Sequence, residues 1–456
     1  MISSEFLDRI SKQFTREQYS TSNNDLKLVS HDESSLNSCL PSIVIYPSNT
    51  DEVSYIVKLA YYYSIPITAR GAGSSLEGNS IPEESGIVID FSKMNRIIKL
   101  RKNDLQVTVE AGVVYKKLNE ELKSHGLFFP PSPGGSSDIA TIGGMVSTNA
   151  SGIYSVKYGG TRDYILKLKL VTAKGDIIEI GNHCTKSSSA YNLVGLICGS
   201  EGTLAIITEI TLKLKGVPET FNRFAYTFPN EQQAVLAISE MMKYALDIAA
   251  LEYLDKHCIE ALNQLNSYGL EEKPVIFFEL QGTESSIEDV KTYINSICND
   301  FRGKEMQLSD QQNPWEIRHH TTTAIKLRKK DYTIIRNDIA FPISKLPNVV
   351  EKCYQLANEK NLMIHTFGHA GLGILHVLIL ANKTNAEEWN NALELNKTII
   401  EHALELGGST SGEHGIGLSL RPYMVKEHGT SLDIMKEIKK LFDPKGILNP
   451  SKIFPK

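Results

Sequence analysis

The spacing of hydrophobic and polar residues changes character near residue 217 of the chain. Before that point short apolar runs rich in β-branched residues predominate, and such runs predict strands. The predicted strands are Ile43–Tyr46, Ile65–Ala69, Gly86–Asp90, Leu105–Glu110, Ile165–Thr172, Ile177–Ile180 and the long segment Thr203–Lys215. Helical spacing in the same region predicts helices over Thr50–Ala60 and Val114–His125, after a segment, residues 1–40, that begins helical and becomes irregular.

Beyond Gly216 and Pro218 the apolar residues follow helical spacing over longer stretches. The predicted helices cover 231–246, 254–267, 285–301 and Ile434–Phe442, with strands such as Val275–Gln281 and Tyr332–Ala340 among them. This order predicts an α+β layout distinct from that of the first region. At 456 residues the chain is too long for one ordinary core, so we expect two or three domains.

The composition is that of a soluble globular protein, with 41% hydrophobic and 22% charged residues. The net charge of −5 offers no basic surface for nucleic acid. No apolar run approaches the roughly 20 residues that span a bilayer, and the N-terminus lacks the basic and apolar regions of a signal peptide. We therefore expect a cytoplasmic protein, at most resting peripherally on the inner face of the membrane.

The cysteines are scattered and carry no metal-binding spacing. They lie at positions 39, 184, 198, 258, 298 and 353, with no Cys-x-x-Cys pair. This spacing argues against an iron–sulfur cluster, a thiolate zinc site and a disulfide framework, and predicts buried, unreactive thiols.

Two glycine-rich stretches, Arg70–Asn79 and Pro133–Gly152, carry the strongest chemical signal. Glycine lets backbone N–H groups turn toward phosphate oxygens, and hydroxyl and amide side chains in both stretches add donors. The donors are Ser74, Ser75, Ser136, Ser137, Thr141, Ser147, Thr148 and Asn149. Such loops suggest a dinucleotide held by its pyrophosphate, either FAD or NAD. The glycine spacing of residues 71–78 fails the Gly-x-Gly-x-x-Gly pattern of nicotinamide sites, which argues for FAD.

An ordered set of motifs along the chain resembles one flavoprotein family. The motifs are Arg70–Gly78, Gly86–Asp90, Met94–Arg96, Val109–Gly112, Phe129–Gly134, Ala140–Met145, Thr148–Gly152, Lys157–Gly159, Lys186–Ser187, Tyr191–Leu193, Gly199–Thr203 and Ile447–Pro450. Together they resemble FAD-dependent oxidoreductases of the vanillyl-alcohol-oxidase type, with a PCMH-type FAD domain. Within that type the similarity is to the D-lactate and glycolate dehydrogenase branch, which includes D-2-hydroxyglutarate dehydrogenase, and it leans toward the cytochrome- or quinone-linked D-lactate members.

The resemblance implies an α+β fold in which a two-part FAD-binding domain is followed by a cap with a sheet flanked by helices. The implied boundaries are an N-terminal helical segment (1–40), the FAD domain (41–217), the cap or substrate domain (218–410) and a C-terminal segment completing the active site (411–456). We expect the FAD to be bound non-covalently, although the sequence itself leaves covalent attachment open. The expected FAD contacts are Arg70, Gly71, Ala72, Gly73, Ser74, Ser75, Gly78, Pro133, Gly134, Gly135, Ser136, Thr141, Gly144, Ser147, Asn149, Gly152, Glu201, Gly202, Ile207 and Asn449.

Two histidines and a glutamate form a candidate metal site. His369 and His376 are seven residues apart, and the glycines between them suggest a loop that brings both imidazoles to one point. Glu413 and His414 lie in a second glycine-rich turn, and two His plus one Glu is a ligand set of catalytic zinc sites. The resemblance places His369, His376 and Glu413 on the family's divalent metal ligands, with zinc expected, and His414 on its proposed base.

The sequence departs from the family inside this loop. Leu372 and Ile374 stand where relatives carry Asp and Asn, whose polar groups would support the metal or the substrate. We expect this change to weaken metal binding or to alter substrate preference.

Arginines in the second region are candidates for binding a substrate carboxylate. The planar fork of an arginine matches a carboxylate with two parallel hydrogen bonds. Arg318 matches the family's carboxylate-binding arginine, Thr322 lies one helical turn further on, and Arg336 occupies a position that is basic in relatives.

The sequence therefore predicts a dehydrogenase for a small D-2-hydroxy acid, with D-lactate favoured. The hydride would pass from C2 to flavin N5, and the electrons to a quinone, a cytochrome or an electron-transfer flavoprotein. Dehydrogenation of glycolate or D-2-hydroxyglutarate is the alternative within the family. A non-catalytic flavin-binding subunit of a redox complex and an NAD-dependent dehydrogenase are alternatives from other classes, and a homodimer is left open.

Overall fold

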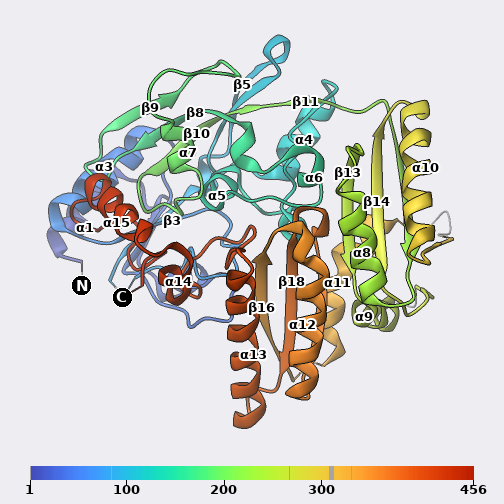
Figure 1. Ribbon diagram of the computed structural model, residues 1–456. Helices are drawn as coiled ribbons and strands as arrows, with labels where there is room; N and C mark the ends of the chain where they lie inside the picture. The colour runs from blue at the N-terminus through green and yellow to red at the C-terminus, as the bar shows by residue number, and fades with distance from the viewer. Residues whose placement is uncertain (1, 84, 267, 308–312, 330, 456) are drawn as a thin grey trace. The chain divides into compact units, whose positions relative to one another are not determined.

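The computed structural model describes residues 2–83, 85–266, 268–307, 313–329 and 331–455 (Figure 1). Contacts divide the chain into two compact units. Unit 1 is Met1–Ser151, Gly160–Val217 and Glu413–Lys456, and unit 2 is Gly152–Gly159 and Pro218–Gly412. Among the described residues no helix is both long and apolar enough to cross a bilayer.

Unit 1 contains a small sheet whose inner strands are parallel. Its order is β1 (Tyr19–Ser20), β2 (Ile43–Ile45), β4 (Ile87–Asp90), β3 (Ile67–Arg70), and β1 alone runs antiparallel to its neighbour. Strands β2 and β4 are buried along their whole length, and their residues are apolar except Asp90, as expected of parallel strands covered on both faces. Helix α3 (Thr50–Tyr63) connects β2 to β3, and the Asn49 side chain caps it by accepting from the Glu52 N–H.

A five-stranded antiparallel sheet forms the rest of unit 1's framework. Its order is β5 (Ile97–Arg101), β6 (Gln106–Glu110), β10 (Ile206–Lys213), β8 (Ile165–Val171), β9 (Ile177–Gly181). The short helix α5 (Ile142–Thr148) packs against β6 and β10. Gly143 allows this close approach, since a Cβ added to it would lie 2.8 Å from both the carbonyl oxygen and the Cβ of Ala111.

Shorter elements complete unit 1. Its remaining helices and strands are α1 (Ser4–Gln13), α2 (Asn23–Leu28), α4 (Tyr115–Lys123), β7 (Leu127–Phe128), α7 (Leu193–Ile197), β11 (Lys215–Gly216), α14 (Met424–His428) and α15 (Ser431–Phe442). Its 3₁₀ turns are η1 (Phe91–Lys93), η2 (Lys102–Asp104), η3 (Gly134–Ser136), η4 (Thr161–Tyr164) and η7 (Arg421–Tyr423).

Unit 2 is built on a seven-stranded antiparallel sheet. Its order is β15 (Lys304–Glu305), β12 (Thr220–Thr227), β14 (Val275–Gly282), β13 (Ile248–Leu254), β17 (Met363–Gly368), β18 (Ile374–Ala381), β16 (Thr333–Ala340). The helices are α6 (Ser155–Tyr158), α8 (Glu231–Met241), α9 (Lys256–Asn266), α10 (Glu284–Asp300), α11 (Pro314–Arg328), α12 (Leu346–Glu359) and α13 (Ala386–Glu405), with the 3₁₀ turns η5 (Ile343–Lys345) and η6 (Ala370–Leu372).

The two faces of this sheet carry different helices. Phe277, Leu254 and Phe367 point to one face, where they form a core cluster with buried residues of α9 and α11. The alternate strand residues point to the opposite face and hydrogen-bond to other helices there: Tyr226 to α10, Thr366 to α12 and Asn337 to α13. The register places Glu252, His376 and Asp338 on the same face as Phe367. Charged residues on a face otherwise packed as a core mark it as a candidate site.

Candidate functional site

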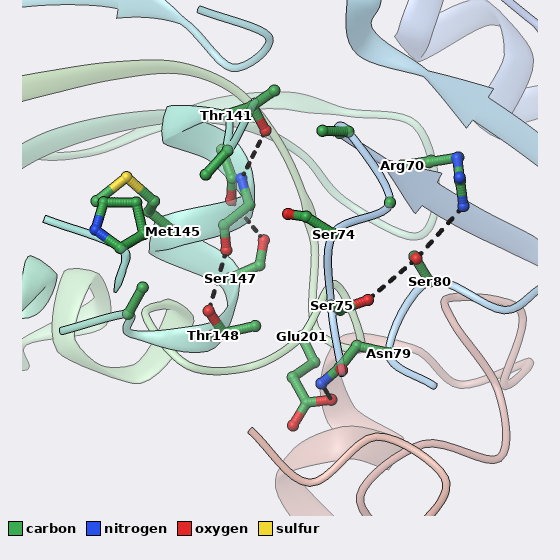
Figure 2. Close-up of a pocket in the computed structure, with 18 of the residues that line it drawn as sticks. Arg70, Ser74, Ser75, Asn79, Ser80, Thr141, Met145, Ser147, Thr148 and Glu201 are labelled. Carbon is green, nitrogen blue, oxygen red and sulfur yellow. Dashed lines mark hydrogen bonds between the residues drawn. The ribbon is translucent and has the colours of Figure 1, made fainter. Parts of the chain in front are cut away.

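One pocket of unit 1 brings the two glycine-rich stretches together (Figure 2). All the predicted FAD contacts line it except Gly78, Asn149 and Gly152. Other described residues add to the lining, namely Ala69, Leu76, Asn79, Ser80, Phe91, Ala111, Ala140, Gly143, Met145, Thr148, Ala150, Ser151, Ala205, Ile206, Glu413 and His414. We call this the glycine-loop pocket.

Arg70 braces the first loop. Its guanidinium donates to the carbonyl oxygens of His31, at 2.7 Å, and Leu28, at 3.3 Å. Gly73 lies directly over the guanidinium with a φ of +70°, and a Cβ there would come within 2.0 Å of Nη2. Ser75 donates to a carboxylate oxygen of Asp32 at 2.8 Å. The segment between β1 and β2 therefore helps to hold this loop in place.

The second loop touches the first through one residue pair. Thr141 caps α5 by accepting from the Gly144 N–H at 3.2 Å, as Figure 2 shows. A Cβ on Gly71 would lie 2.2 Å from the Thr141 Oγ1, so only glycine fits at this contact. Beside it, Gly134 and Gly135 have no atom within 4 Å of an added Cβ, which leaves their backbone open.

Glu201 holds the turn that carries Glu413 and His414. Its carboxylate accepts from the Ile416 N–H at 2.7 Å, the Gly417 N–H at 2.9 Å and the Asn79 side chain at 2.7 Å. Burial raises the pKa of Glu201, while these hydrogen bonds oppose the rise.

Within this turn both candidate residues have carboxylate or hydroxyl neighbours. Glu413 accepts from the Ser151 hydroxyl at 2.7 Å. The Nδ1 of His414 lies 3.5 Å from a carboxylate oxygen of Glu77, which also accepts from the Ser419 hydroxyl. These contacts place a carboxylate and an imidazole at the glycine-loop pocket.

In unit 2 the β17–β18 hairpin brings His369 and His376 together. His369 ends the hairpin's first arm and His376 lies in β18, so that their ring centroids are 5.5 Å apart. The loop expected between them is present as the 3₁₀ turn η6 and Gly373, and it brings the two imidazoles together. His376 Nδ1 is 3.3 Å from a carboxylate oxygen of Asp338, its partner on β16.

Arg318 is tied to this cluster through a residue that the sequence patterns did not reveal. The Nε of Arg318 donates to Glu252 at 2.7 Å, and the other oxygen of Glu252 lies 2.5 Å from His369 Nδ1. The guanidinium also stacks over the Phe367 ring, 4.6 Å from its centroid. A glutamate inside the apolar run Ile248–Leu254 was the available signal for this site.

The other predicted residues of unit 2 lie near these elements. Thr322 is half-buried on α11, one turn after Arg318, and Arg336 is half-buried on β16, on the same sheet face as Asp338. Leu372 is 38% exposed in η6, whereas Ile374 is buried at the start of β18. The ligand types fit a divalent cation, because imidazole and carboxylate are its usual donors and carboxylates fix both rings through Nδ1.

Comparisons with known proteins agree with the two halves of the chain. Residues 41–181 match the family model "FAD binding domain", and residues 217–453 match "FAD linked oxidases, C-terminal domain".

Among curated proteins, the chain is 34% identical to "D-lactate dehydrogenase [cytochrome], mitochondrial" of Arabidopsis thaliana, covering 91% of this chain and 74% of that protein. It is also 34% identical to "Glycolate oxidase subunit GlcD" of Bacillus subtilis (strain 168), covering 100% and 98%. A "D-lactate dehydrogenase" of Archaeoglobus fulgidus is 34% identical, covering 91% of each.

Solved structures show the same fold at low identity. p-Cresol methylhydroxylase with substrate bound superposes with a TM-score of 0.82 at 15% identity, covering 99% of this chain and 97% of that one. 4-Ethylphenol oxidase from Gulosibacter chungangensis superposes with a TM-score of 0.80 at 17% identity, covering 100% and 98%.

Proposed function

The chain belongs to the FAD-linked oxidases and is an FAD-dependent hydroxy acid dehydrogenase, and on that premise we propose that it oxidises D-lactate to the corresponding 2-oxo acid. The observation that carries the proposal is the Arg318–Glu252–His369 cluster of unit 2. In this cluster Arg318 would bind the carboxylate of a 2-hydroxy acid, and His369 would help to hold a metal at its hydroxyl group. A site for a 2-hydroxy acid needs both kinds of group. Relatives named D-lactate dehydrogenase support the substrate.

In this proposal Arg318 binds the substrate carboxylate through its Nη edge. Its Nε is held by Glu252 and its face by Phe367, so the fork is fixed in one plane before substrate arrives. Thr322 and Arg336 complete the carboxylate site. The apolar Leu372 and Ile374 favour a methyl side chain over the second carboxylate of D-2-hydroxyglutarate.

His414 takes the proton of the substrate hydroxyl as general base. A divalent metal, expected as zinc and held by His369, His376 and Glu413, would supply Lewis acidity at that hydroxyl when bound. FAD, when bound in the glycine-loop pocket, supplies the two-electron acceptor for the C2 hydride. The electrons leave to a quinone, a cytochrome or an electron-transfer flavoprotein.

We propose that the FAD domain is 41–217, the substrate domain 218–410 and the completing segment 411–456. The FAD is proposed to be non-covalent, because the pocket's described lining offers no cysteine or tyrosine, and His414 is needed as the base. Precipitation with acid should then release all flavin into the supernatant, whereas flavin retained in the pellet would contradict this point.

Glycolate is the second candidate substrate. The relative named glycolate oxidase subunit GlcD matches the whole of this chain at the same identity, 34%, as the D-lactate dehydrogenase of Arabidopsis thaliana. Glycolate lacks the methyl group that Leu372 and Ile374 are proposed to favour.

Anaerobic rapid mixing of the purified protein with D-lactate, L-lactate and glycolate tests the proposal. We expect D-lactate to bleach the flavin absorbance fastest and L-lactate not to bleach it. Bleaching by neither lactate isomer, or equally by both, would refute the assignment. Arg318→Gln should raise the D-lactate concentration for half-maximal bleaching by about 100-fold, while the exposed Arg302→Gln control should not.

A further inference from the structure

Glu252 is a fully buried carboxylate that bonds to two functional groups at once. One of its oxygens lies 2.5 Å from His369 Nδ1 and the other accepts from Arg318 Nε at 2.7 Å. Burial alone would raise the pKa of Glu252, but its interactions with Arg318 and His369 outweigh burial and hold that pKa below its ordinary value. The two partners come from different elements, the β17–β18 hairpin and α11.

The fold itself does not require a charge at this position. Strand β13 is buried along its whole length, and its other residues are aliphatic or aromatic. A buried ion pair is often no more stabilising than well-packed apolar residues of the same volume. The geometry of the partners is therefore the more informative property of Glu252.

Each bond fixes its partner in one geometry. A carboxylate at His369 Nδ1 makes that nitrogen the proton donor, so any bond to a metal is made by Nε2. The Nε bond stops the Arg318 guanidinium from rotating, and the Phe367 ring 4.6 Å away fixes its plane. Movement of the Glu252 carboxylate would release both groups together.

We propose that Glu252 is a positioning residue that couples the metal site to the substrate-carboxylate site, by orienting His369 and Arg318 through its two oxygens. The inference rests on the proposed function and adds to it. It predicts that one substitution weakens both metal binding and substrate binding, although Glu252 touches neither ligand.

Glu279 provides a matched control on the same face of the sheet. It is equally buried on β14, with its carboxylate bonded by Arg223 Nε at 2.6 Å, Gln281 at 2.6 Å and the Trp315 indole. It bonds to neither of the groups assigned to metal or substrate. Glu279→Gln and Glu252→Gln both replace a buried, arginine-paired carboxylate, so their comparison separates positioning from stability.

The experiment measures zinc binding and substrate KM on the flavin-loaded protein. After chelation, zinc dissociation constants are determined by equilibrium dialysis for wild type, Glu252→Gln and Glu279→Gln. An amide can accept from only one of the two donors, so Glu252→Gln should weaken zinc binding about 10- to 100-fold. The KM for D-lactate should rise at least about 10-fold, with FAD content unchanged. Glu279→Gln should keep both constants near wild type.

Arg318→Lys separates the two effects, because it removes the Nε donor but leaves the Glu252–His369 bond in place. It should raise the KM strongly, whereas zinc binding should weaken less than in Glu252→Gln, since Glu252 still orients His369. If Glu252→Gln does not fold, Glu252→Asp replaces it, since the shorter side chain cannot reach both partners.

Unchanged zinc binding and KM in the Glu252 variant would overturn the inference, as would equal losses in Glu279→Gln. Failure of the proposed function is a different result. In that case wild-type protein binds no zinc, or D-lactate does not reduce its flavin.

Discussion

The contact between Gly71 and Thr141 gives the sharpest prediction about the cofactor pocket. In Gly71→Ala the new methyl group would lie 2.2 Å from Thr141 Oγ1, well inside van der Waals contact. Gly71 has no positive φ, so the effect is steric rather than conformational. Overpacking costs about 1–3 kcal/mol, and loss of the Thr141 cap on α5 costs about 1 kcal/mol more.

We expect the two loops to move apart in the apoprotein and relieve this clash, whereas both loops line the pocket that FAD would occupy. Most of the cost therefore falls on the free energy of FAD binding. About 2–4 kcal/mol corresponds to a rise in the FAD dissociation constant of roughly 30-fold to several hundred-fold. Titration of apoprotein with FAD, followed by flavin fluorescence, measures this constant.

A second variant separates the clash from general damage. In Gly71→Ala with Thr141→Ala the nearest remaining atom of residue 141 is Cβ, at 3.3 Å, so the double variant should bind FAD more tightly than Gly71→Ala alone. Gly216→Ala, which meets no atom within 4 Å, serves as the control. The reasoning is refuted if Gly71→Ala binds FAD within about threefold of wild type, or if the two substitutions are additive.

Three further predictions concern buried polar groups and thiols. Burial lowers the pKa of Lys452 to about 8, so between pH 8 and 10.5 the unfolded chain binds more protons than the folded protein. The unfolding free energy should therefore rise across this window by up to about 3 kcal/mol relative to Lys452→Met, and parallel pH profiles of the two proteins in urea denaturation would contradict this. Glu201→Gln leaves a backbone N–H of the 413–417 turn without an acceptor, which costs about 1–3 kcal/mol. The Ile416 and Gly417 amides should then exchange hydrogen at least about tenfold faster, and unchanged exchange rates would contradict this prediction. A thiol reagent should modify the exposed Cys184 first, and the four buried cysteines only after unfolding, because burial raises their thiol pKa; rapid loss of all thiols in native protein would disprove this.

The local spacing of apolar residues predicted those helices and strands whose sequence pattern matches their observed structure. The helix expected from Thr50 is present and runs to Tyr63, and the strand expected over Tyr332–Ala340 is β16. The predicted helix 231–246 ends at Met241, five residues early, because Leu246 begins the approach to β13. These cases differ only at the ends of elements, where propensity is weakest.

The missed elements carry residues whose role depends on distant partners. Strand β13 contains Glu252, which interrupts the apolar pattern of the strand. Its role is explained only by its contacts with His369 and Arg318, which are far away in the sequence. Glu201 was predicted as an FAD contact, but its bonds to the turn around His414, like the contact of Glu77 with His414, could not be predicted from the sequence. Spacing within one segment cannot reveal such pairs, because they are created by tertiary packing.

Unit 1 is assembled from segments that lie on both sides of unit 2 in the sequence, and this imposes an order on its synthesis. Residues 218–412 leave the ribosome before Glu413, His414 and Asn449, which line the glycine-loop pocket. The bridge between Ile67 and Leu448 joins positions separated by the whole of that insert. A nascent chain can therefore fold residues 218–412 before the C-terminal residues that complete the pocket lining are synthesised. Prior folding of residues 218–412 shortens the distance between the segments of unit 1 that must meet. Retention of the cofactor should be a late event in the life of each new chain.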